Sequence, residues 1–164
     1  KRFPPLADTP PHQMAESLRG YYQSLSQRRE NVVIESSVKL LKKLAQAYPV
    51  AIVSGSPRDD VAEAVKLMGA EKKVRCILGA EDYCPGKPSP VGFLAGARIL
   101  GVDPAECVVF EDSQAGVKAA KAAGMFCVAL ARPNALPQDL SAADLVLTDL
   151  SEFSLEALQP QRAK

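Results

Sequence analysis

The sequence predicts an α/β protein whose parallel sheet is flanked by helices on both faces. Three observations support this fold class. From residue 50 onward, short apolar runs alternate with helix-like segments of about three turns. The apolar runs are continuous rather than alternating with polar residues, as expected for strands buried on both faces. Glycines and prolines separate the runs from the helical segments, in the positions where turns are needed.

The elements follow from local patterns. Strands are predicted in the apolar runs at residues 50–53, 74–78, 107–110, 126–131 and 145–147. Helices are predicted at residues 14–28, 37–47, 57–68, 89–100, 113–123 and 152–158. The helix at 57–68 has Ser56 as its expected N-cap, Pro57 at its first position and Asp59 in place to close a capping box. Gly69 follows its end, where glycine often stops a helix.

Composition narrows the function classes. The 164 residues fit one compact domain, with 47% apolar and 24% charged residues and a formal net charge of +1. Neither a nucleic-acid partner nor a membrane surface is indicated by this charge. The longest apolar run, residues 126–131, is too short to cross a bilayer, and no signal-peptide pattern follows Lys1. The four cysteines form no CxxC pair and only one histidine is present, so we expect a reduced, cytoplasmic protein without structural zinc.

Polar residues follow three of the predicted strands where an open α/β sheet carries its chemistry, at the carboxyl ends. Ser54 and Gly55 end the strand at 50–53. A hydroxyl and free backbone amides just before a helix start favour a bound anion. Lys87 lies in a loop whose two prolines and glycine would hold a single cation over the sheet edge.

Two adjacent carboxylates, Glu111 and Asp112, follow the strand at 107–110. The two carboxylates repel each other, and removing them from water without a cation is costly in free energy. A hard metal ion such as Mg²⁺, bound through oxygen, would remove that cost. The sequence therefore predicts a metal site at the end of this strand.

Each motif also has a purely structural explanation. Ser56 would only cap its helix, Lys87 would be a solvated surface charge, and Asp112 or Ser113 would cap the helix at 113–123. The loop around Lys87 is not a Walker A loop, because Pro88 stands where Ser or Thr would reach magnesium.

Taken together, the three motifs indicate a phosphoryl-transfer site. Ser54 and the Gly55 amide would hold phosphate oxygens, and Lys87 would offset charge on the transferring group. Asp112 would hold Mg²⁺, with Glu111 as a second ligand or as a neighbour that orients the ligands.

The same motifs resemble those of the haloacid dehalogenase superfamily, in the branch of β-phosphoglucomutase, phosphoglycolate phosphatase and small sugar phosphatases. Residues 51–56, 86–90 and 109–117 resemble its second, third and fourth motifs, and the likeness spans about residues 36–150. The resemblance implies a Rossmann-like core and a magnesium-dependent enzyme that acts on a small phosphorylated metabolite. It also implies catalytic roles for Ser54, Lys87 and Asp112.

The family's first motif, D-x-D-G-T at the end of the central strand, has no match in the sequence. Its first aspartate is the nucleophile that becomes phosphorylated. The resemblance implies that residues 1–30 are an irregular lead-in and the last part of a helical cap. Residues 31–164 would then be the α/β core without its first, central strand. We therefore expect this chain alone to be inactive.

Residues 31–37 leave one alternative open. This short β-branched run would either be the linker that returns from the cap or occupy the central position itself. In the second case Glu35 and Ser37 would stand where the two aspartates belong.

Two classes of function follow. The first is a phosphatase that works through an aspartyl-phosphate, with a sugar phosphomutase as its variant. The second is a non-catalytic phosphate-binding or assembly protein on the same fold, whose central position is filled by a second copy or by a partner strand.

Overall fold

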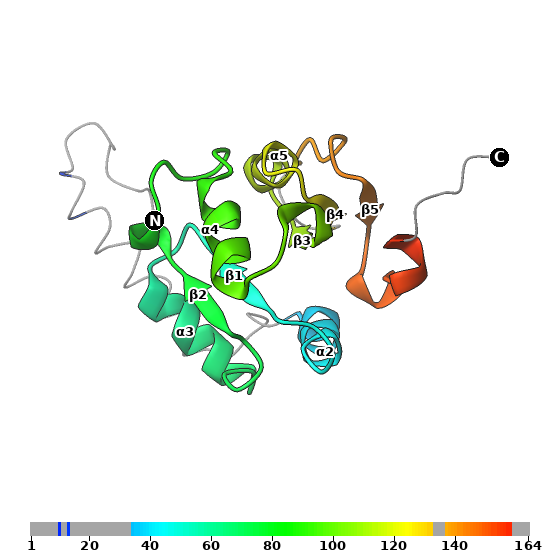
Figure 1. The fold of residues 1–164 in the computed structure, drawn as a ribbon, viewed down its shortest axis with the longest axis horizontal. Helices are drawn as coiled ribbons and strands as arrows, with labels where there is room; N and C mark the ends of the chain where they lie inside the picture. Colours follow the sequence, from blue (N-terminus) through cyan, green and yellow to red (C-terminus); the bar gives the residue numbers. More distant parts are fainter. Residues whose placement is uncertain (1–9, 11–12, 14–33, 133–136, 159–164) are drawn as a thin grey trace, which may run out of the picture. The chain divides into compact units, whose positions relative to one another are not determined.

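The computed structural model describes residues 10, 13, 34–132 and 137–158 of the 164. The chain divides into two compact units, Lys1–Ile34 and Glu35–Lys164. The helix predicted at residues 14–28 lies outside the described residues. All elements discussed below belong to the second unit, coloured from cyan to red in Figure 1.

Strands and helices alternate along this unit. The strands are β1 (Ala51–Val53), β2 (Cys76–Leu78), β3 (Val108–Glu111), β4 (Phe126–Leu130) and β5 (Leu145–Leu147). The helices are α2 (Glu35–Leu44), α3 (Arg58–Leu67), α4 (Val91–Leu100) and α5 (Gln114–Ala122). Short 3₁₀ turns lie between them at η2 (Ala80–Asp82), η3 (Pro104–Glu106), η4 (Leu150–Glu152) and η5 (Leu155–Leu158).

All strand pairs are parallel, which confirms the predicted fold class. The strands form two sheets, one with the order β1-β2 and one with the order β3-β4-β5. In these sheets Val53 is paired with Leu78 and Glu111 with Ala129, so the carboxyl ends of paired strands lie together.

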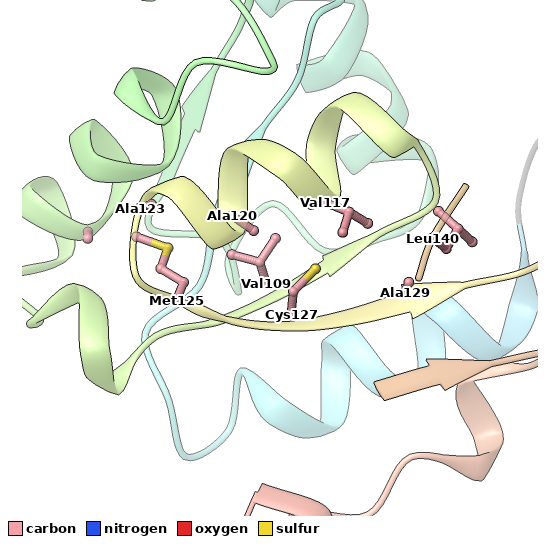
Figure 2. Close-up of a cluster of buried hydrophobic side chains, with 9 residues drawn as sticks. Val109, Val117, Ala120, Ala123, Met125, Cys127, Ala129 and Leu140 are labelled. Atoms are coloured by element: carbon pink, nitrogen blue, oxygen red, sulfur yellow. The ribbon is translucent and has the colours of Figure 1, made fainter. Parts of the chain in front are cut away.

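Helices pack on each sheet. Helix α4 contacts β1 and β2, α3 contacts β2, and α5 contacts β3 and β4. The side chains of Val117 and Ala120 on α5 point toward Val109 and Cys127 of the strands beneath (Figure 2). These four residues are fully or almost fully buried, and they anchor the larger core cluster.

An apolar cavity of about 260 Å³ lies beside β3 and the start of β1. Its lining includes Leu44, Val50, Val108, Phe110 and Phe153. Strands β1 and β3 are not hydrogen-bonded to each other, and each pairs along only one edge within the described residues. The other edge of β1 and the other edge of β3 therefore pair with no strand among the described residues.

The start of α3 differs from the prediction. Pro57, not Ser56, occupies the N-cap position, and no side chain of the cap residue bonds to the helix. The carboxylate of Glu81, on η2, instead accepts the Arg58 N–H at 2.9 Å. A free backbone N–H at the start of the helix is thus hydrogen-bonded by a side chain 23 positions further along the chain.

The ends of the helices follow the prediction more closely. Gly69, Gly101 and Gly124, which follow α3, α4 and α5, have positive φ angles of 60°, 70° and 74°. Ser113 caps α5 by accepting the Gly116 N–H at 3.0 Å. At the C-terminal end, the helix predicted at 152–158 is instead the two 3₁₀ turns η4 and η5.

Glu35 and Ser37 lie in helix α2, so they do not stand at the end of a central strand. This contradicts the alternative in which residues 31–37 form that strand, because a helical segment cannot pair with β1 or β3. The four cysteines are all free thiols. None of the described helices is long and apolar enough to cross a membrane.

Candidate functional site

Ser54 and Gly55 follow directly after β1, at its carboxyl end. The Ser54 hydroxyl oxygen accepts the Ser56 N–H at 3.1 Å, which folds the loop back on itself. The Gly55 N–H has no hydrogen-bond partner among the described residues, and a Cβ placed on Gly55 would meet no atom within 4 Å. One backbone amide of this loop is therefore exposed and available to an anion.

The loop after β2, residues 79–88, is fastened to the start of α3. The Arg58 guanidinium is ion-paired with Asp82, with Nε at 2.9 Å from Oδ2. The Ala80 N–H donates to the Ser56 carbonyl oxygen at 2.9 Å. The pairing with Arg58, followed by the Gly79 N–H, lowers the pKa of Asp82, so this carboxylate stays charged at neutral pH.

Lys87, further along that loop, reaches across to both sheets. Its Nζ donates to the Val53 carbonyl oxygen at 3.2 Å and is ion-paired with the Glu111 carboxylate. The same amine lies 4.8 Å from the centre of the Phe93 ring. The sequence alone left open whether Lys87 is a surface charge. The structure instead has its side chain largely buried, at 18% exposed.

Glu111, the last residue of β3, is held from several sides. Its Oε2 accepts the Ser113 hydroxyl at 3.0 Å and the Asp112 N–H at 3.2 Å. A methyl group on Gly116 would overlap its carboxylate, so the absence of a side chain there makes room for it. With 8% of its side chain exposed and both oxygens engaged, Glu111 holds Lys87 in place rather than facing solvent.

Asp112 faces another cation. Its Oδ2 lies 3.1 Å from Nη2 of Arg132, just after β4, and about half of each side chain is exposed. In the described part of the chain, no group of three or more His, Cys, Asp or Glu side chains lies close enough to hold a metal ion. Asp112 suits one ligand position for Mg²⁺, which accepts as few as one or two carboxylates together with water and phosphate oxygens.

The structure thus brings together Ser54, Lys87 and Glu111, because Lys87 bonds the residue before Ser54 and the end of β3 at once. Asp112 is adjacent in sequence but pairs with Arg132 instead. Sequence reasoning missed several contributors, namely Tyr83, Arg132, Gly116 and the pair of Arg58 with Asp82. Only Gly116 carried a sequence signal, since it lies within the segment that resembles the family's fourth motif.

Comparison with known proteins gives consistent results. A family model described as haloacid dehalogenase-like hydrolase matches residues 7–124. Validoxylamine A 7'-phosphate phosphatase from Streptomyces hygroscopicus subsp. limoneus is 36% identical over 140 residues, which cover 85% of this chain and 65% of that protein. Hexitol phosphatase A from Escherichia coli (strain K12) is 36% identical over 123 residues, covering 74% of this chain and 56% of that protein.

Among solved structures, a β-phosphoglucomutase from Clostridium difficile has a TM-score of 0.74 and 28% identity, covering 90% of this chain and 64% of that one. The chain therefore spans less than two thirds of the length of each of these three relatives. The family model covers well over half of the 164 residues. The chain belongs to the haloacid dehalogenase-like hydrolase family.

Proposed function

We propose that this chain carries the phosphate-binding side of a phosphatase site for a small phosphorylated metabolite. The position of Lys87 is the observation that carries the proposal. Its amine lies at the carboxyl ends of β1 and β3, bonded to the Val53 carbonyl and paired with Glu111. A cation fixed at the end of β1, where the chain continues into the loop with the exposed Gly55 amide, suits the oxygens of a phosphate group.

Each residue has a proposed role. The Ser54 hydroxyl and Gly55 amide bind phosphate oxygens, and Lys87 offsets the charge that develops on the transferring group. Asp112 supplies one ligand to Mg²⁺, which acts as a Lewis acid when bound. Glu111 keeps Lys87 oriented. For that reason we assign Glu111 as a positioning residue rather than a metal ligand.

The nucleophile of the proposed aspartyl-phosphate pathway is missing from the sequence, which contains no D-x-D pattern. We propose that a further parallel strand carrying this aspartate fits between β1 and β3. The free edges of both strands and the apolar cavity of about 260 Å³ beside them support this. The greater length of the relatives also supports it. On this proposal the 164 residues alone do not turn over substrate.

A sugar phosphomutase is the second candidate, favoured by the match to β-phosphoglucomutase in both sequence and structure. Such an enzyme moves the phosphoryl group from one hydroxyl to another, and the same phosphate-binding residues would serve it. A non-catalytic protein that binds phosphate, or assembles through the free strand edges, is the alternative outside enzyme chemistry.

The test compares the chain alone with a version in which a D-x-D-bearing strand is placed ahead of it, on a broad panel of phosphorylated metabolites with Mg²⁺. We expect no turnover from the chain alone and magnesium-dependent release of inorganic phosphate from the completed protein. A Lys87→Met change in the completed protein should lower turnover at least a hundredfold.

Other outcomes distinguish the candidates. Phosphoryl movement between two hydroxyls of a sugar phosphate without release of inorganic phosphate would favour the mutase. A completed protein that folds and binds phosphate but converts no member of the panel would support the non-catalytic alternative and contradict both enzymes.

A further inference from the structure

The peptide unit between Ser54 and Gly55 is oriented by a hydrogen bond from another loop. The Tyr83 hydroxyl donates to the Ser54 carbonyl oxygen at 3.0 Å. A trans peptide is planar, so its C=O and N–H point in opposite directions. Fixing the Ser54 carbonyl therefore also fixes the direction of the Gly55 N–H, which is the exposed amide of this loop.

Tyr83 is itself held firmly. It is 8% exposed, and its ring lies so close to Gly92 that a Cβ there would come within 2.8 Å of the ring. The loop that carries it is fastened to α3 by the ion pair of Arg58 with Asp82. Burial, and then the nearby Glu111 carboxylate, raises the pKa of Tyr83, so its hydroxyl stays protonated and can donate.

Two consecutive carbonyls, that of Val53 at the end of β1 and that of Ser54 after it, are thus bonded from the same segment. Lys87 donates to the Val53 carbonyl and Tyr83 to the Ser54 carbonyl. The loop after β2 therefore provides the Lys87 cation and also orients the backbone at residues 53–55. A shift of this segment would move both together.

We propose that Tyr83 is a positioning residue that aims the Gly55 amide at a bound phosphate group, an inference that rests on the proposed function. Tyr83 itself does not touch the phosphate. It acts through the peptide plane, and its contribution is a preorganised amide that needs no reorientation when the anion binds. A single neutral hydrogen bond is worth about 1 kcal/mol, so losing the orientation that it gives the Gly55 amide weakens affinity by about fivefold at most.

The experiment uses the full 164-residue chain and inorganic phosphate as the probe. The variant Tyr83→Phe removes the hydroxyl and keeps the ring that packs on Gly92. Tyr48→Phe is the matched control, because Tyr48 is 51% exposed and its hydroxyl makes no hydrogen bond among the described residues. Phosphate affinity is measured by calorimetric titration, and the Gly55 amide is followed by ¹H–¹⁵N NMR in the same titration.

We expect Tyr83→Phe to weaken phosphate binding about twofold to fivefold and to reduce the phosphate-induced shift of the Gly55 amide signal, with a fall in thermal midpoint of no more than about 2–4 °C. Tyr48→Phe should match the unchanged chain in all three measurements. Phosphate binding and a Gly55 response that Tyr83→Phe leaves intact would overturn the inference alone. A weakened affinity accompanied by a large fall in thermal midpoint would also overturn it, because it would indicate a general structural role. An unchanged chain that binds no phosphate would overturn the proposed function and this inference with it.

Discussion

The amine of Lys87 is ion-paired with the carboxylate of Glu111, a residue 24 positions further along the chain. The pair joins the two sheets at their carboxyl ends, although β1 and β3 are not hydrogen-bonded to each other. Its partners are 18% and 8% exposed, so water screens neither charge well. The pair is therefore a structural link between the sheets as well as part of the candidate site.

Replacing Lys87 tests that link. Lys87→Met keeps most of the side-chain volume and leaves the Glu111 carboxylate buried without its cation. Breaking a buried ion pair in this way costs about 3–5 kcal/mol, so we expect the free energy of unfolding to fall by about 3 kcal/mol. Urea denaturation followed by circular dichroism measures the difference.

An exposed ion pair provides the control. Lys39 and Glu35 are paired at 2.8 Å on the surface of α2, with side chains 73% and 81% exposed. Lys39→Met should leave the urea midpoint almost unchanged, because solvent screens this pair. Equal effects of the two substitutions would contradict the view that burial gives the Lys87 pair its importance.

Gly116 is predicted to be intolerant of even a methyl group. Gly116→Ala would force the Glu111 carboxylate away from its place, since the new Cβ overlaps it. We expect a loss of roughly 1–3 kcal/mol in unfolding free energy, although alanine favours a helix over glycine. Gly86→Ala is the comparison, because a Cβ there meets no atom within 4 Å. Thermal denaturation of both variants should show a lower midpoint only for Gly116→Ala.

The cysteines should differ sharply in reactivity. Burial, and then the negative charge of Glu111 and Asp144, raises the pKa of the Cys127 thiol to about 11. Cys127 is fully buried, whereas Cys84 is exposed. At pH 8 we expect a thiol reagent such as iodoacetamide to modify Cys84 first and Cys127 only on unfolding. Peptide mass mapping over time gives the order, and early labelling of Cys127 in the folded protein would contradict it.

Asp144 should contribute to acid sensitivity. Burial alone would raise its pKa, but the ion pair with Lys121 at 2.6 Å and the Cys127 N–H at 2.7 Å together hold the pKa below its ordinary value of 3.8. A lowered pKa in the folded state stabilises the fold above pH 3.8, and this stability is lost as the pH falls below that value.

The variant Asp144→Asn removes this titration and keeps an oxygen for the Cys127 N–H. We expect it to flatten the fall in stability below pH 4, measured as urea midpoints between pH 2.5 and 7. Asp60→Asn is the control, since Asp60 is exposed and makes no ion pair among the described residues. A pH profile that Asp144→Asn leaves unchanged would argue against the role assigned to this carboxylate.

Arg132 should compete with a divalent cation for Asp112. The guanidinium lies 3.1 Å from the carboxylate, at an exposed pair worth up to about 1 kcal/mol. Arg132→Ala is therefore expected to tighten Mg²⁺ binding by up to about fivefold, measured by calorimetric titration. Arg98→Ala, on the exposed side of α4, should have no effect. Weaker Mg²⁺ binding by the Arg132 variant would contradict the competition.

Local patterns predicted the elements well where the cause is local. Continuous apolar runs identified the strands, and Gly69, Gly101 and Gly124 marked helix ends because a positive φ is a requirement of one residue. Ser113 as a cap follows the same logic. Prediction was wrong at the start of α3, where Glu81 from a distant turn satisfies the helix in place of Ser56. No rule based on neighbouring residues can find such a contact.

The site residues also divide into those with a local sequence signal and those that depend on long-range contacts. Ser54, Lys87 and Glu111 follow strands or lie in a rigid loop, so the sequence indicated them and the structure brings them together. Tyr83 and Arg132 gave no signal, because their partners are 29 and 20 positions away and each acts through a single long-range contact.

One hydroxyl, that of Ser113, donates to Glu111 and accepts the Gly116 N–H. The Ser113 hydroxyl oxygen therefore takes part both in holding the Glu111 carboxylate and in capping the first turn of α5. A ligand that draws Glu111 away would leave the Ser113 hydroxyl without its acceptor. We expect the cap on Gly116 to loosen as a result and the amide hydrogen of Gly116 to exchange faster with solvent. Ligands that strengthen the pair of Lys87 with Glu111 would slow that exchange. We therefore expect the exchange rate of the Gly116 amide to report site occupancy at a backbone position that need not contact the ligand.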